Sequence, residues 1–108
     1  MLKFPVVALS CATFAAQAAE TFGVPAELWD RPRSGQAVLA QPAVKQAVKA
    51  HLARPSSSLV IRHAAGQEGT LQAEELRAWL IALAIPSGRV RLSGTLNPGE
   101  PLMIEISP

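Results

Sequence analysis

The residues of this 108-residue chain best suited to chemistry lie together between positions 62 and 72. Arg62 and His63 follow the apolar run Leu59-Val60-Ile61, and Glu68 lies in the glycine-bearing segment after them. A guanidinium, an imidazole and a carboxylate held close together could bind a charged ligand through charge-assisted hydrogen bonds. Loops are ordinarily polar and exposed, however, so a solvated loop is the interpretation we favour.

The sequence does not have the residues that a metal centre or a covalent mechanism would need. His51 and His63 are the two histidines, Cys11 is the single cysteine, and neither a His-x-His nor a His-Glu-x-x-His motif occurs. We expect His51 to be a partly buried or surface side chain of its helix. Ser56, Ser57 and Ser58 follow a predicted helix end and have no glycine-flanked nucleophile motif around them. We therefore predict a protein that is not an enzyme and that carries no metal and no cofactor.

Residues 1–18 have the pattern of a cleaved secretory signal peptide. Lys3 gives a short positive start, Phe4 to Ala16 is uncharged and mostly apolar, and Ala16-Gln17-Ala18 is a small-x-small cleavage site. The apolar run is shorter than the roughly 20 residues that a membrane-spanning helix needs. We expect the signal peptide to be removed and the mature protein to be periplasmic.

Cys11 leaves a second route of export open. A cysteine inside a bacterial export signal can become the lipid-bearing first residue of a lipoprotein, although only a short apolar run of about six residues precedes it here. A lipoprotein anchored through Cys11 is therefore the alternative. This lipid, or an uncleaved signal peptide, would be the chain's one expected contact with a membrane.

Charge and composition narrow the class of partner. Loss of Lys3 with the signal peptide leaves nine basic and eight acidic side chains and lowers the formal charge from +2 to +1. The basic residues are scattered and are not interleaved with stacking aromatic residues, so we expect no nucleic-acid partner. One cysteine cannot form an internal disulfide, and a chain of this length holds one small domain.

Periodicity predicts the elements that would position residues 62 to 72. Apolar residues recur at helical spacing over 42–53, which predicts a first helix. They recur again in a second predicted helix, which has Thr70 as a plausible N-cap and ends at about residue 84. Leu52 and Leu71 fall on these two apolar stripes. Three segments have the residue pattern of strands: 58–63, 89–93 and 102–106.

This order of elements predicts a small α+β domain over residues 42–108. A strand, a helix and a second strand within about 30 residues imply a parallel pair with a right-handed crossover, and the final strand can pair antiparallel at an edge. We expect a two-layer sandwich of βαβαββ type, with two helices packed on one face of a small mixed sheet. Residues 19–41 are expected to form an extended arm that adds an edge strand near Glu27-Leu28-Trp29 and buries the Trp29 indole against the body.

Two local contacts are also predicted. Arg77 is expected to pair with Glu74 on the surface of the second helix. If the final strand lies at an edge, Met103 is exposed beside Leu102 and Ile104 and the strand could pair with a partner. Alternatively, Met103 packs beneath the arm that contains Trp29, because a small domain needs most of its apolar residues for its own core.

Three segments, taken in order, resemble the OmpA-like domain of peptidoglycan-associated proteins: HLARPSSSLVIRHAAG, QAEELRAWLIALAIPSGRVRL and LMIEI. In that family a helix ends near an Asn-Pro pair, a strand runs into Gly-His-Thr-Asp, and the next helix begins with Arg-Ala. The resemblance covers about residues 42–107. It implies the same α+β fold and a place in the bacterial envelope.

The departures from the family pattern fall on its ligand-binding positions. In OmpA-like domains the aspartate after His-Thr and the arginine that opens the second helix bind the diaminopimelate of peptidoglycan stem peptides through charge-assisted hydrogen bonds. With His63 on the family histidine, the aspartate falls on Ala65 and the arginine on Gln72. Neither side chain carries a charge, so the resemblance implies the scaffold without its usual ligand site.

Three functions therefore remain open. The first, which we expect, is an exported module that binds an envelope protein or has a structural role and has lost diaminopimelate binding. The second is weak peptidoglycan binding through an altered site formed by Arg62, His63, Glu68 and Gln72. The third, disfavoured by the small number of possible ligands, is a small enzyme or metal carrier that uses His63 and Glu68.

Overall fold

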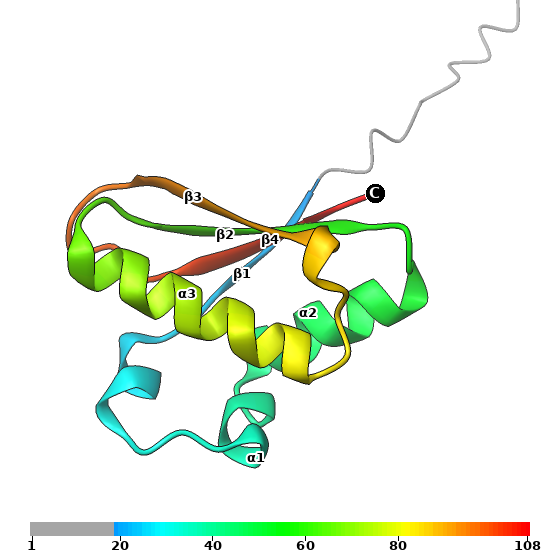
Figure 1. Ribbon diagram of the computed structural model, residues 1–108, viewed down its shortest axis with the longest axis horizontal. Helices are drawn as coiled ribbons and strands as arrows, with labels where there is room; N and C mark the ends of the chain where they lie inside the picture. Colours follow the sequence, from blue (N-terminus) through cyan, green and yellow to red (C-terminus); the bar gives the residue numbers. More distant parts are fainter. Residues whose placement is uncertain (1–18) are drawn as a thin grey trace, which may run out of the picture.

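The computed structural model describes residues 19–108, which form a four-stranded mixed sheet with helices packed against one of its faces (Figure 1). The predicted α+β class and the two-layer arrangement are confirmed. The predictions for the signal peptide, including Cys11, fall outside the described residues.

The sheet has the strand order β1-β4-β2-β3. Its strands are β1 (Glu20–Gly23), β2 (Ser58–Ala64), β3 (Val90–Leu96) and β4 (Met103–Ser107). β2 and β3 pair in parallel across the predicted crossover, and β4 pairs antiparallel with both β1 and β2. The prediction that the final strand lies at an edge is wrong, because β1 pairs with the outer side of β4. The two edges of the sheet are β1 and β3.

Residues 19–41 contribute an edge strand, but not where it was predicted. Glu27, Leu28 and Trp29 lie in η1, a 3-10 helix over Ala26–Asp30, whereas the strand β1 comes before it. Pro25 separates the two elements because its ring fixes φ near −61° and removes the backbone donor that a strand ladder would use. A short helix, α1 (Gly35–Leu39), completes the segment.

Three apolar side chains anchor this N-terminal segment in the hydrophobic core. Val24, Leu28 and Val38 are all buried, and the backbone N–H of Val24 donates to the Leu102 carbonyl at 2.8 Å. Trp29 is half-buried and packs against the same core, as predicted. The segment is therefore held by burial of apolar side chains as well as by the β1–β4 ladder.

The helix α2 (Pro42–Ala53) has the predicted bounds, whereas α3 (Gln67–Ala82) begins and ends earlier than predicted. Thr70 is not the N-cap of α3. It lies in the first turn, and its hydroxyl donates to the Gly66 carbonyl at 2.8 Å. Leu52 and Leu71, which were predicted on the apolar stripes, are 61% and 56% exposed. A 3-10 turn, η2 (Ser87–Arg89), leads into β3.

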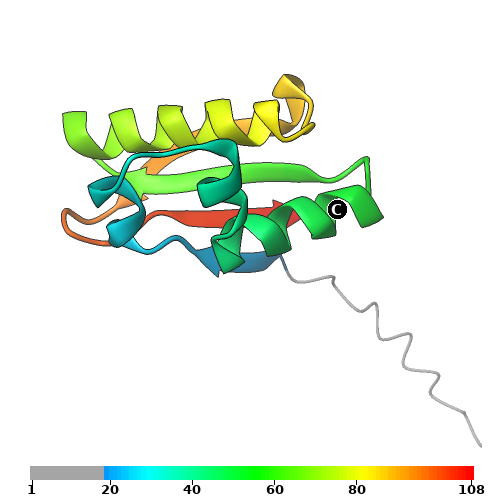
Figure 2. The ribbon, with the colours of Figure 1, turned by 90° about the horizontal axis from the view of Figure 1, so that it is seen from below.

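The two long helices cover the same face of the sheet. α3 packs over β2 and β3, whereas α2 packs over β4 and β1 (Figure 2). Alternate residues of β2 and β4 point toward them and are buried: Leu59, Ile61, His63, Ile104 and Ile106. The residues between them in sequence, including Arg62, Met103 and Glu105, lie on the opposite, open face. The core therefore lies between the sheet and the helices.

Candidate functional site

The structure does not bring the four predicted site residues together. Arg62 and His63 are neighbours on β2, so the pleat of the strand directs their side chains to opposite faces of the sheet. Glu68 and Gln72 lie one turn apart on α3, with Gln72 Nε2 3.5 Å from Glu68 Oε1. The predicted cluster is therefore reduced to this pair.

Arg62 is held by an ion pair on the open face of the sheet. Its Nε donates to Glu105 Oε2 at 2.9 Å and its Nη2 donates to Glu105 Oε1 at 3.1 Å, while Nη1 donates to the Thr95 hydroxyl. The hydrogen bonds and the charge of Arg62 lower the pKa of the Glu105 carboxyl, and those of Glu105 raise the pKa of Arg62. Arg62 thus links β2 to β3 and β4 and points away from Glu68.

His63 is buried on the helix side of the sheet. Its Nδ1 lies 2.8 Å from the carbonyl oxygen of Ala64, and this nitrogen must carry the hydrogen because a carbonyl can only accept. The ring packs against Gly94 of β3, where an added Cβ would lie 3.2 Å from the His63 Cε1. His63 therefore packs beside β3 and does not line the cavity described next.

Glu68 and Gln72 line a cavity of about 310 Å³ at the ends of the parallel strands. Its wall consists of the β2–α3 loop and the first turn of α3 (Ala64–Gly69), the turn Pro98–Leu102, and Ala26 and Trp29. Ala65, which the sequence resemblance matches to an aspartate, lies in the same wall. The cavity is thus lined by both positions at which the sequence lacks the expected charge, Ala65 and Gln72.

The cavity is negatively charged. Two of its lining residues are carboxylates, Glu68 and Glu100, and none is basic. Glu68 lies in the first turn of α3, where the helix dipole stabilises a negative charge, and Glu100 accepts a hydrogen bond from the backbone N–H of Asn97. The cavity can accept hydrogen bonds or a positive charge, but it presents no cation to a carboxylate ligand.

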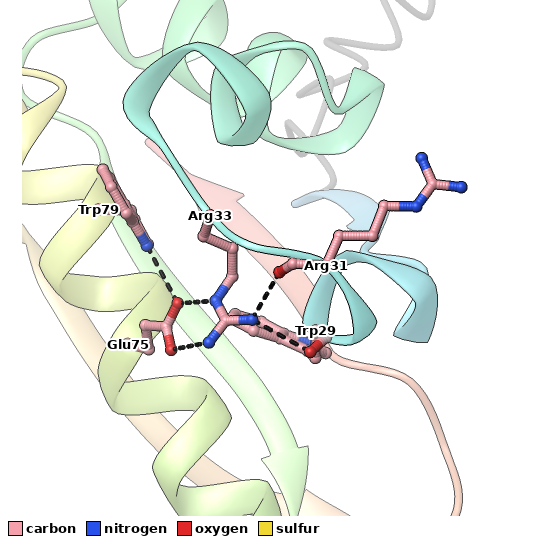
Figure 3. A network of polar contacts seen from close by, with 5 residues as sticks. All are labelled: Trp29, Arg31, Arg33, Glu75 and Trp79. Atoms are coloured by element: carbon pink, nitrogen blue, oxygen red, sulfur yellow. Dashed lines mark hydrogen bonds and ion pairs between the residues drawn. The ribbon is translucent and has the colours of Figure 1, made fainter.

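A polar network fixes Trp29, one wall of this cavity, against α3 (Figure 3). Arg33 donates from Nε and Nη2 to the two carboxylate oxygens of Glu75, and from Nη1 to the carbonyls of Trp29 and Arg31. Its guanidinium lies 5.5 Å from the centre of the Trp29 ring, and Trp79 Nε1 donates to Glu75 at 3.2 Å. The network joins the N-terminal segment to the middle of α3.

The environment of Glu75 favours its charged form. Burial alone would raise the pKa of its carboxyl, but the hydrogen bonds from Arg33 and Trp79 and the charge of Arg33 outweigh this effect, so the pKa lies below the ordinary glutamate value. Glu75 is therefore a structural anion that holds Arg33, and it does not line the cavity.

Sequence reasoning missed most of the cavity, although one signal for it was present. The carboxyl ends of the parallel strands β2 and β3 lie at the same edge of the sheet, so the loops after them must meet there. The turn-rich segment Asn97–Pro101 follows β3 and could have been placed opposite the β2–α3 loop on this ground. Trp29 carried no such signal, because its position depends on Arg33 and Glu75.

Two further sequence interpretations are corrected. Arg77 does not pair with Glu74: its Nε donates to the Val90 carbonyl and its Nη2 to the Ser87 carbonyl, at the start of β3. His51, interpreted as a partly buried or surface residue, is buried, and its Nδ1 lies 3.0 Å from the hydroxyl of the equally buried Ser57. This contact connects the last turn of α2 to the loop before β2.

Within residues 19–108, no three His, Cys, Asp or Glu side chains gather where they could hold a metal ion. In the same part of the chain, none of the helices combines the length and the apolar character that crossing a membrane requires. Comparisons with protein-family models, with curated proteins and with solved structures found no match to this chain.

Proposed function

We propose that this chain is an exported, non-catalytic protein of the bacterial envelope whose degenerate OmpA-like domain serves as an interaction or structural module and has lost diaminopimelate binding. The observation that carries the proposal is the charge of the cavity beside α3. Diaminopimelate presents carboxylates, which need a basic partner, and the lining residues offer the carboxylates of Glu68 and Glu100 and no basic side chain.

The positions of Ala65 and Gln72 support the same proposal. Both residues line the cavity, Ala65 from the segment before α3 and Gln72 from the helix itself, and the resemblance matches both to family positions that carry a charge. A methyl group and an amide cannot form the charge-assisted hydrogen bonds that make carboxylate binding strong.

Sedimentation with purified peptidoglycan sacculi tests this proposal, and we expect the wild-type chain to stay in the supernatant. The double variant Ala65→Asp, Gln72→Arg should sediment with the sacculi, because it restores both charges inside the cavity. Leu71→Arg is the matched control: it adds the same arginine at an exposed neighbouring position outside the cavity wall and should not be retained.

Two results would contradict the proposal. Failure of the double variant to sediment, although it folds like the wild type, would show that the cavity does not correspond to the family site. The second result is that the wild-type chain sediments with the sacculi and that Glu68→Ala or Gln72→Ala abolishes this sedimentation. It would favour peptidoglycan binding through an altered site. One observation favours this second candidate: Glu68 and Gln72 do share a cavity, whereas Arg62 and His63 lie outside it.

The export part of the proposal has its own test. Cell fractionation with mass spectrometry of the purified protein should find a periplasmic chain that begins at Ala19. A membrane-bound form that begins with a lipid-modified Cys11 would support the lipoprotein alternative. A cytoplasmic chain that retains residues 1–18 would contradict export altogether.

A further inference from the structure

The outer edge of β3 has no strand beside it in the part of the chain that the structure describes (Figure 1). β3 spans seven residues, contains no proline and pairs with β2 on its inner side alone. The backbone groups on the outer side of an edge strand can form a ladder with another extended chain. The opposite edge, β1, is only four residues long.

This edge lies in a stretch of the chain that has basic residues and no acidic ones. From Leu76 to Gly99 the sequence has three arginines, Arg77, Arg89 and Arg91, and no acidic residue. Arg77 and Arg89 donate to backbone carbonyls and to no carboxylate, while the exposed Arg91 makes no hydrogen bond or ion pair with residues 19–108. The nearest carboxylate on the open face, Glu105, is engaged by Arg62.

The open face carries a groove over β2 and β3, the edge strand. A groove of about 270 Å³ is lined by Arg62 and Arg91 with Val60, Leu92 and Ser93. In the register of the sheet Arg91 lies opposite Val60 and Ser93 lies opposite Arg62, so both arginines are on this face. A strand paired with β3 would direct every second side chain to the open face, on which Arg91 lies.

We infer that the outer edge of β3 binds an extended acidic segment of a partner protein by strand addition. This inference deepens the proposed interaction module and rests on that proposal. The charge of the edge selects the occupant, because β3 of a second copy would bring the same arginines and like charges across a strand pair repel. An acidic segment instead gains ion pairs with Arg91 in addition to the backbone ladder.

Fluorescence anisotropy with a labelled nine-residue peptide in which glutamate alternates with valine tests this inference on the full chain. The alternation directs the carboxylates to one face and the apolar side chains to the other. We expect saturable binding that weakens about tenfold in Arg91→Glu, since the reversal replaces attraction by repulsion. Arg31→Glu is the matched control, as it makes the same charge change at an exposed arginine outside β3 and should bind like the wild type.

Two modified peptides separate strand addition from simple charge attraction. Methylation of alternate backbone nitrogens along one edge of the peptide should abolish binding, whereas methylation along the other edge should leave it unchanged, because one edge alone faces β3. A peptide with glutamine in place of glutamate should bind the wild-type chain more weakly than the glutamate peptide does, because it loses the attraction to Arg91.

Several outcomes would overturn the inference. These are no binding of the glutamate peptide, equal binding of the glutamine peptide, or equal effects of the two methylation patterns. Self-association of the chain that Arg91→Glu disrupts, without peptide binding, would assign the edge to a second copy instead. None of these results depends on retention by sacculi, so this inference can fail while the loss of diaminopimelate binding stands.

Discussion

Gly69 shows how one residue decides the position of α3. An added Cβ at this buried position would lie 2.2 Å from the carbonyl oxygen of Ala64, at the end of β2. The first turn of α3 can therefore approach the strand only with glycine there. This approach also places Glu68 and Gln72 in the wall of the cavity.

We predict that Gly69→Ala destabilises the protein by about 1 to 3 kcal/mol, because the helix must move away from rigid backbone atoms. This loss opposes the gain of up to about 1 kcal/mol that alanine ordinarily brings to a helix. Urea unfolding followed by circular dichroism measures the difference. Gly88→Ala is the control, since nothing lies within 4 Å of its added Cβ, and it should change stability by less than about 0.5 kcal/mol. Equal effects of the two substitutions would contradict the argument.

Arg62 and His63 show which part of the candidate site the sequence could decide and which part it could not. Adjacent residues of a strand face opposite sides of the sheet, so a strand from 58 to 63 already separates Arg62 from His63. His63 is the one that faces α3, because it shares a face of the strand with Leu59 and Ile61, which are buried under the helices. The partner of Arg62 then depends on β4 lying next to β2, which is a contact between residues 43 positions apart.

At the scale of elements, local pattern predicted α2, β2 and the parallel crossover, but not the path of residues 19–41. The segment Glu20–Gly23 has no marked alternation, and it forms a strand because β4 offers it an edge. Trp29 and Arg33 take their positions from Glu75, which lies 42 residues beyond Arg33 in the sequence. Such contacts between distant residues leave no periodic signal.

The network around Arg33 should stabilise the attachment of the N-terminal segment to α3. We predict that Arg33→Ala lowers the free energy of unfolding by about 1 kcal/mol, because it removes a two-point ion pair that is only partly exposed. Arg33→Lys should recover little of this loss, because an ammonium cannot bond both Glu75 oxygens and the Trp29 carbonyl in the same geometry. Chemical denaturation of the purified variants measures both effects.

Arg31→Ala provides the control for this network. The carbonyl of Arg31 accepts a hydrogen bond from Arg33, but its own guanidinium points away from the other four residues (Figure 3). We expect wild-type stability for this variant. If Arg31→Ala and Arg33→Ala were equally destabilised, the loss would come from a general effect of charge and not from the contact with Glu75.

For the whole molecule, two carboxylates connect stability to pH. The pKa values of Glu75 and Glu105 lie below the ordinary glutamate value, because Arg33 and Arg62 hold their charged forms. In the unfolded chain these contacts are lost and each carboxyl takes up its proton at a higher pH. As the pH falls, the unfolded state therefore binds protons first, and folding becomes less favourable.

We predict that the free energy of unfolding is constant with respect to these two groups above about pH 5 and falls as the pH drops through the ordinary glutamate range and below it. Because Glu75 holds the N-terminal segment of residues 19–41 through Arg33 and Glu105 ties β4 to β2, the attachments of this segment and of β4 should weaken in the same acidic range. The double variant Glu75→Gln, Glu105→Gln should be less stable at neutral pH and should have a flatter acid profile, as measured by urea unfolding between pH 3 and 7.

A wild-type chain whose stability rises on acidification, or a double variant with an unchanged profile, would show that other groups control the acid response. The two single variants should each remove part of the slope, since their ion pairs lie on opposite faces of the sheet and share no partner.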